Sequence, residues 1–127
     1  MDVLPIALKL HGQRCLLIGG GQIARRKARL LLRAGAVLDV VSPEILPDLL
    51  QDALHSGGQH YPDAYPESTA RLYDYRLVIA ATDQAEINAQ VFRDCEKLNV
   101  LVNSVDDPPH CRFIVPAIID RSPLLVS

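Results

Sequence analysis

A glycine-rich segment directly follows a short apolar run near the start of the chain. The run covers residues 15–18, and Gly19, Gly21 and Ala24 then stand at the spacing G-x-G-x-x-A. At this spacing the first small residue lets a strand turn sharply into a helix, the second lets backbone approach a pyrophosphate, and the third lets helix and strand pack closely. The free N–H groups and the positive dipole end of the helix then face the anion. The segment predicts a dinucleotide site, and the alternative is a tight strand-to-helix turn without a ligand.

Two acidic residues could contact the adenosine ribose of such a ligand. In βαβ units of this kind an acidic residue about 20 positions past the glycines binds the ribose and favours NAD over NADP. Asp39 lies inside a predicted strand over residues 37–41, whereas Glu44 lies just beyond its end, after Ser42 and Pro43. We therefore favour Glu44 and the neighbouring backbone. No basic residue follows this strand to pair a 2′-phosphate, so NAD is the expected cofactor.

Cations crowd the first turns of the helix that follows the glycines. They are Arg25, Arg26, Lys27 and Arg29. Each opposes the helix dipole by roughly 0.3–1 kcal/mol. Either an anionic partner offsets this cost, which would be the pyrophosphate or a carboxylate-rich substrate, or the cations form a solvated face with counterions from elsewhere in the fold.

A second group of small and polar residues ends another predicted strand, over residues 77–81. Here Ala80 and Ala81 precede Thr82 and Asp83. Ligands of open α/β sheets bind along the carboxyl ends of the strands, and small residues there leave room for the nicotinamide side of a dinucleotide. Asp83 is alternatively only a helix N-cap, in a capping box with Glu86.

Carboxylates also follow the predicted strand over residues 100–105. A carboxylate at this edge is a natural general base or metal contact. The cluster resembles a metal site but lacks a standard ligand spacing, so we expect no resident metal and consider a polar turn the alternative. Its members are Asp106, Asp107, His110 and Cys111.

The elements that must position these residues alternate along the chain. Strands, helices and small stop residues predict a right-handed doubly wound α/β fold, a Rossmann-like parallel sheet. The expected strands are 14–18, 37–41, 77–81 and 100–105; the expected helices are 22–34, 47–55 and 84–98, with a short strand, a loop and a helical turn within 59–75. Two further strands without an intervening helix are expected over 113–119 and 124–127.

Composition narrows the class of protein further. The 127 residues suit one domain, and 49% hydrophobic with 22% charged residues is an ordinary globular composition. A net charge of −2 gives no electrostatic reason to expect nucleic acid or a membrane surface as partner. No apolar run approaches the ~20 residues of a membrane helix. Three widely spaced cysteines favour a reduced, cytoplasmic protein over a disulfide framework.

Taken together, these motifs resemble the N-terminal module of siroheme synthase, in the same order and over essentially the whole chain. The resemblance rests on the segments 4–6, 17–27, 80–83, 103–108 and 113–124. It implies a precorrin-2 dehydrogenase and sirohydrochlorin ferrochelatase, an oxidoreductase and a lyase. In that family NAD accepts a hydride from precorrin-2 to give sirohydrochlorin, and Fe²⁺ then enters the macrocycle as a substrate to give siroheme.

The resemblance also assigns roles to residues. Asp106 would serve both steps as a general base, since dehydrogenation and metallation each remove protons from the macrocycle. Gln22, Ile23, Pro43 and Glu44 would contact the NAD. The many carboxylates of the tetrapyrrole would give the helix cations a partner.

The resemblance divides the chain into an NAD-binding domain over 1–112 and the beginning of a dimerisation region over 113–127. The family forms a homodimer through this region, so we expect a chain ending at Ser127 to bind NAD with little or no turnover. The alternative function is a nucleotide-sensing Rossmann module without catalysis, which would need no carboxylate at the nicotinamide edge.

Overall fold

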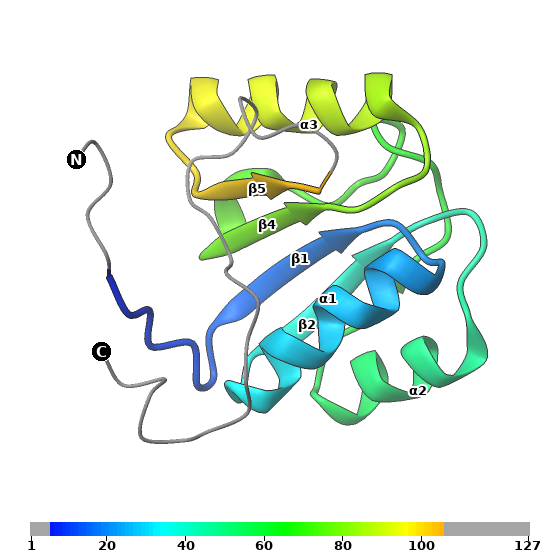
Figure 1. Cartoon of the computed structure of the whole chain (residues 1–127), viewed down its shortest axis with the longest axis vertical. Coiled ribbons are helices and arrows are strands. Elements are labelled where there is room, and N and C mark those ends of the chain that lie inside the picture. The colour runs from blue at the N-terminus through cyan, green and yellow to red at the C-terminus, as the bar shows by residue number, and fades with distance from the viewer. Residues whose placement is uncertain (1–5, 106–127) are drawn as a thin grey trace.

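The chain folds into a parallel sheet with helices on both faces (Figure 1). The structure is a computed structural model that describes residues 6–105. The five strands have the order β3-β2-β1-β4-β5, and all neighbours are parallel. In chain order the elements are β1 (Arg14–Ile18), α1 (Gln22–Arg33), β2 (Val37–Val41), α2 (Pro47–His55), β3 (His60–Tyr61), the 3-10 helix η1 (Leu72–Asp74), β4 (Leu77–Ala80), α3 (Ala85–Leu98) and β5 (Val102–Ser104). The Rossmann-like prediction is confirmed.

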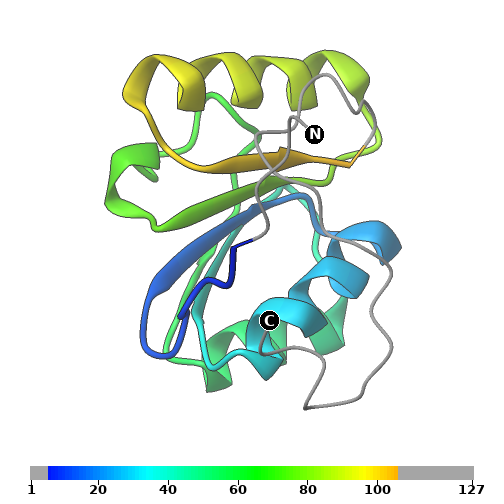
Figure 2. The ribbon, with the colours of Figure 1, turned by 60° about the vertical axis from the view of Figure 1, so that its left-hand side comes forward.

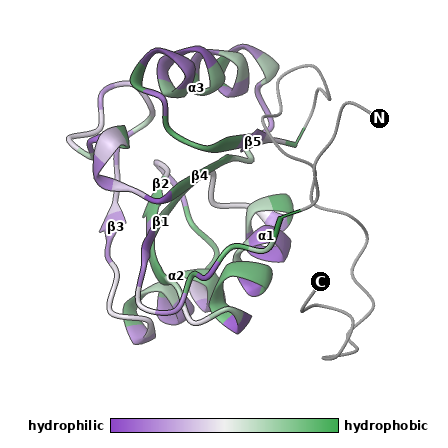
Figure 3. Ribbon diagram, turned by 90° about the vertical axis from the view of Figure 1, so that its left-hand side faces the viewer, coloured by the Kyte–Doolittle hydropathy of each residue, from purple (hydrophilic) through white to green (hydrophobic). Residues whose placement is uncertain are grey.

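Each face of the sheet has its own core, because successive strand residues point to opposite faces. Leu17 packs in the core under α1 and α2, whereas Leu16 and Ile18 pack in the core under α3 and η1. Figures 1 and 2 show α3 on one side of the sheet and α1 with α2 on the other. The central strands are coloured as hydrophobic in Figure 3, as strands covered on both faces should be.

The strand order creates a switch point at the carboxyl edge of the sheet. From β1 the chain moves outward through β2 to β3, and it then returns to place β4 on the other side of β1. Ile18 at the end of β1 pairs with Val41 of β2 and with Ala80 of β4. Ligands of doubly wound folds bind at such a point, outside the carboxyl ends of the strands.

The helix ends follow the predicted stop residues with one shift. Gly35 ends α1 in the left-handed region with φ 79°, as the sequence predicted. At the end of α3, Asn99 takes φ 57° and the N–H of Val100 donates to the carbonyl of Cys95 at 2.9 Å. Val100 therefore still belongs to the helix terminus, and β5 begins at Val102 rather than at residue 100.

The predicted capping box at the start of α3 is wrong. Gln84, not Asp83, is the N-cap, and its side chain makes no capping bond. The hydroxyl of Thr82 accepts the N–H of Gln84 at 3.1 Å instead. This side chain turns the chain before the helix begins, which leaves the carboxylate of Asp83 exposed.

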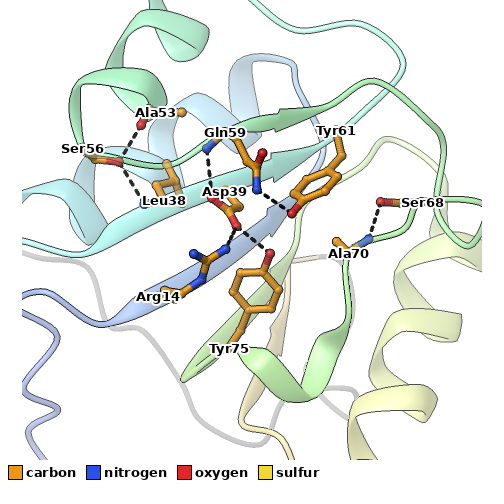
Figure 4. A network of polar contacts seen from close by, with 10 residues as sticks. All are labelled: Arg14, Leu38, Asp39, Ala53, Ser56, Gln59, Tyr61, Ser68, Ala70 and Tyr75. Atoms are coloured by element: carbon orange, nitrogen blue, oxygen red, sulfur yellow. Dashed lines mark hydrogen bonds and ion pairs between the residues drawn. The ribbon is translucent and has the colours of Figure 1, made fainter.

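Asp39 is buried within a polar network in the middle of β2 (Figure 4). Its carboxylate accepts bonds from Arg14 at 2.5 Å, from the Tyr75 hydroxyl at 2.6 Å and from the N–H of Gln59 at 2.9 Å. The guanidinium of Arg14 also lies 5.5 Å from the centre of the Tyr75 ring. These bonds occupy Asp39 inside the fold, which leaves Glu44 as the candidate for the ribose contact.

Replacing Asp39 by alanine should lower the free energy of unfolding by about 3 kcal/mol, because the change removes the acceptor of all three bonds and leaves the buried Tyr75 hydroxyl without one. Urea unfolding measures the loss. Asp63→Ala, at an exposed loop position, is the matched control and should change stability by less than about 0.5 kcal/mol. Equal stability of the two variants would contradict the assigned role of the network.

Cys15 and Cys95 are free and fully buried in the two separate cores. Burial raises the pKa of the Cys15 thiol to about 11 and that of Cys95 to about 12. Both thiols therefore stay neutral and poorly nucleophilic in the folded chain.

We expect neither of these thiols to react with iodoacetamide at pH 8 until the chain is unfolded. Because folding raises both pKa values, the two thiols make their full contribution to the free energy of unfolding below about pH 9, where the thiols of the unfolded chain are still protonated. This contribution falls as pH rises towards 11. Peptide mapping after alkylation and urea unfolding at pH 8 and 10.5 check the two statements. Rapid alkylation of the native chain at Cys15 or Cys95 would contradict them.

Several sequence predictions fall outside residues 6–105. They are the catalytic role of Asp106, the metal-like cluster with Asp107, His110 and Cys111, and the strands and dimerisation region after residue 112. Within 6–105, no three His, Cys, Asp or Glu side chains are placed to hold a metal ion. No helix in that part is long and apolar enough to span a membrane.

Candidate functional site

A cleft of about 700 Å³ opens at the switch point of the sheet. It is formed by the carboxyl ends of β1, β2 and β4, the glycine turn and the segment after β3. Every residue that the sequence predicted to contact a cofactor lines this cleft, namely Gly19, Gly21, Gln22, Ile23, Ser42, Pro43, Glu44, Thr82 and Asp83. The structure thus brings these residues together, and their contacts with a ligand stay a prediction.

Gly19 and Gly20 are required by the fold itself. Gly19 has φ 131°, and a Cβ there would lie 2.3 Å from the carbonyl oxygen of Ala81. A Cβ on Gly20 would lie 2.0 Å from the carbonyl oxygen of Glu44, and the Gly20 carbonyl accepts the N–H of Leu46 at 2.9 Å. These two glycines therefore let the turn after β1 pack closely against the backbone of the segments that follow β4 and β2.

Gly21 is different, because nothing within the described protein requires a glycine there. Its φ of −97° suits any residue, and a Cβ would meet no atom within 4 Å. It is the N-cap of α1, where Ser or Asp would satisfy a free N–H of the first turn. The first turn carries no acidic residue and no side-chain cap. The first N–H groups of an α-helix have no partner within the helix, and Gly21, Gln22 and Ile23 line the cleft, an arrangement that fits the phosphates of a dinucleotide.

The turn after β2 forms the opposite wall. Ser42 is buried and its carbonyl accepts the Nε2–H of His60 at 2.8 Å. This bond, together with the contacts to Gly20, holds the turn against the glycine segment. Pro43 and Glu44 are exposed into the cleft. A fixed turn with one free carboxylate suits recognition of ribose hydroxyls.

The turn after β4 is held from α3 by Asn88. Asn88 is 1% exposed; its Oδ1 accepts both the N–H of Thr82 at 3.1 Å and the Thr82 hydroxyl at 2.7 Å, and its Nδ2 donates to the Thr82 carbonyl at 3.1 Å. Every polar group of Thr82 is thus engaged within the protein. Thr82 fixes the loop, and Asp83 is the polar side chain that this loop leaves exposed at the cleft.

One of the helix cations has a counterion within the fold. Arg25 donates to Asp48 at 2.6 Å, and this bond lowers the pKa of the Asp48 carboxyl. Asp48 lies in the first turn of α2. Arg25 therefore has a counterion from elsewhere in the fold, which was one of the two alternatives for the helix cations. Arg26 and Arg29 lie exposed on α1.

Sequence reasoning missed the parts of the wall that come from unpatterned segments. Ile45 and Leu46 follow the β2 turn, Ala64 and Tyr65 lie in the segment after β3, and Gln84 and Ile87 begin α3. The only signal for Tyr65 was an aromatic residue between prolines in a stretch without periodicity. For Asn88 the available signal was an asparagine within the predicted helix 84–98, because an Asn that is buried on a helix needs polar partners nearby.

Known proteins resemble this chain in sequence and in fold. The siroheme synthase of Acinetobacter baylyi is 56% identical over 127 residues, which is 100% of this chain and 28% of that protein. The siroheme synthase of Chromobacterium violaceum is 54% identical over 127 residues, 100% of this chain and 27% of that protein. The chain thus spans little more than a quarter of the length of these relatives.

A solved structure titled "SirC, precorrin-2 dehydrogenase" superposes with a TM-score of 0.73 at 22% identity, covering 94% of this chain and 57% of that one. This likeness shows a shared fold. A family model described as "Putative NAD(P)-binding" matches residues 6–117, which include the glycine turn and the walls of the cleft. The chain belongs to this NAD(P)-binding family.

Proposed function

We propose that this chain is the NAD-binding module of a precorrin-2 dehydrogenase, which oxidises precorrin-2 to sirohydrochlorin in siroheme biosynthesis. The observation that carries the proposal is Gly21, a glycine that the fold does not need at an uncapped helix N-terminus within the cleft. The names of the siroheme synthase relatives and of the structural neighbour supply the substrate class.

The residues of the chain would bind and orient the cofactor. The N-terminal N–H groups of α1 would hold the pyrophosphate, with Gly21 leaving its approach open. Glu44 would accept hydrogen bonds from the adenosine ribose. The loop fixed by Asn88 would border the nicotinamide side. When bound, NAD supplies the acceptor for the hydride that leaves the substrate.

The position of β5 in the sheet indicates which residues would lie on the substrate side of the cleft. β5 lies beside β4 and ends at Ser104, so the chain leaves the sheet at the same edge as the cleft. Asp106, two positions further on, is proposed as the general base that takes the substrate proton. The exposed cations Arg26 and Arg29 would face the carboxylates of the tetrapyrrole.

The direct test is formation of NADH from NAD and precorrin-2, followed at the NADH absorbance band. Because the chain spans 28% of a siroheme synthase relative, the full-length protein is used for turnover and the 127-residue chain for binding. NADH formation at a rate that depends on precorrin-2 is expected. NAD binding without any turnover by the full-length protein would instead favour the nucleotide-sensing alternative. Insertion of Fe²⁺ and homodimer formation stay predictions.

The choice of NAD over NADP is proposed to depend on Glu44. Its carboxylate would repel a 2′-phosphate and bind a 2′-hydroxyl. We expect Glu44→Arg to weaken NAD by roughly 10-fold and to reverse the preference towards NADP, in line with a lost charge-assisted bond and a gained phosphate partner. Calorimetric titration with both cofactors measures this, with Glu67→Arg, at an exposed position, as the control for charge. If the ratio of the dissociation constants for NAD and NADP is unchanged in Glu44→Arg, Glu44 does not contact the ribose.

A further inference from the structure

Tyr65 stands at one end of the cleft. It lies in the segment after β3, and β3 flanks β2 on the side away from β1. The cleft wall formed by the turn after β2 carries Glu44, the proposed ribose ligand, so the chain that leaves β3 borders the adenosine end of the cleft. Tyr65 also packs against the core on the α3 face, as Ile87 does.

The orientation of the Tyr65 ring is fixed from α3. The hydroxyl of Tyr65 donates to one oxygen of Asp94, and Nε2 of Gln90 donates to the other oxygen at 2.8 Å. Burial and the bond to Asp94 raise the pKa of the Tyr65 hydroxyl, so it remains a neutral donor. Since its polar atom is engaged with α3, Tyr65 offers the cleft an aromatic ring rather than a hydrogen-bonding group.

The surroundings of this ring differ from the rest of the cleft. Near α1 the cleft presents backbone N–H groups, and near β2 it presents a carboxylate. The segment after β3 contributes Ala64 and Tyr65 to the lining, and Ile87 of α3 adds an apolar side chain to the same cleft. Adenine is a flat base with an apolar π-face, which stacks well on an aromatic ring with aliphatic neighbours. The nicotinamide ring is charged and carries an amide, so its end of the dinucleotide does not require an aromatic wall.

From this geometry we infer that Tyr65 forms the wall on which the adenine of the bound dinucleotide stacks, and that Asp94 is the positioning residue that holds the ring. The inference rests on the proposed NAD site and assigns the adenine end of it. Specificity for the adenine half is therefore built from α3 and from the segment after β3, and not from the glycine turn.

The test compares the two halves of the cofactor by calorimetry on the 127-residue chain. The probes are NAD, AMP and nicotinamide mononucleotide. Tyr65→Leu keeps apolar volume and removes the aromatic face; we expect it to weaken NAD and AMP by roughly 10-fold, the size of a lost base–aromatic stack, with nicotinamide mononucleotide unchanged. Tyr65→Phe keeps the face and should retain more affinity than Tyr65→Leu. Tyr73→Leu, at an exposed tyrosine outside the cleft, is the matched control and should bind as wild type.

A further variant guards against a loss of folding in Tyr65→Leu. Tyr65→Trp keeps an aromatic face and adds the only tryptophan of the chain, whose fluorescence AMP should quench and nicotinamide mononucleotide should not. Wild-type affinity of Tyr65→Leu for AMP, an equal loss for both mononucleotides, or no quenching in a folded Tyr65→Trp that binds NAD would each overturn the inference while the NAD site stands. Failure of the wild-type chain to bind NAD would overturn the proposed function and this inference with it.

Discussion

We expect Gly21→Asp to abolish NAD binding while making the chain slightly more stable. The new carboxylate caps the first turn of α1 and complements the helix dipole, which together add on the order of 0.5–1 kcal/mol. The same carboxylate fills the open space at Gly21 and repels a pyrophosphate, so the dissociation constant for NAD rises at least about 100-fold, equivalent to about 3 kcal/mol. Thermal unfolding and calorimetry on one sample measure the two opposite effects.

Two companion variants separate the ligand from the fold. Gly21→Ser caps the helix without adding charge, so it should keep the stability of wild type and lose less affinity than Gly21→Asp. Gly19→Ala places a Cβ 2.3 Å from the Ala81 carbonyl oxygen and should destabilise the chain for a reason unrelated to NAD. If Gly21→Asp binds NAD as wild type does, the glycine turn is a structural turn and the proposed phosphate site is wrong.

We expect Asp106→Asn to abolish dehydrogenation and to leave NAD binding unchanged. A positioned general base contributes typically about 10²–10⁴-fold to rate, and an amide of the same shape cannot take the proton. NADH formation from precorrin-2 by the full-length protein measures the loss, and calorimetry measures the binding. The drop is expected in kcat more than in KM, because the carboxylate acts on the reacting proton.

Asp107→Asn is the matched control, since it removes the neighbouring carboxylate. It should keep most of the turnover. Full activity of Asp106→Asn would exclude this residue as the base. A protein in which neither substitution changes any NAD-dependent property would fit the nucleotide-sensing module, which needs no carboxylate at this edge.

The helices and central strands could be predicted from the sequence because their signals are local. Apolar runs, the face formed by Ala24 and Ala28, and the stop at Gly35 each depend on neighbours within a few residues. The glycine spacing predicted the turn after β1, and the ends of the predicted strands, with the family resemblance, predicted the other residues that meet at the switch point. The open space at Gly21 and the crowding at Gly20 needed the structure, since the atoms that meet a Cβ on Gly20 come from residues more than 20 positions away.

The polar partners could not be predicted for the same physical reason. Asp39 takes its bonds from Arg14, 25 positions earlier, and from Tyr75, 36 positions later, and no local pattern encodes such pairs. The capping box at Asp83 failed because α3 begins one residue later than the box requires, with Gln84 as the N-cap, while the Thr82 hydroxyl, held by Asn88, accepts the N–H of Gln84. Both cases concern short polar side chains, whose choice of partner is decided by the tertiary structure.

The measurement that tests the central claim most directly is a calorimetric titration of the 127-residue chain with NAD, repeated with Gly21→Asp. The account predicts saturable one-site binding by the wild-type chain and none by the variant, although the variant unfolds at an equal or higher temperature. Absence of NAD binding by the folded wild-type chain, or equal binding by both, would contradict it.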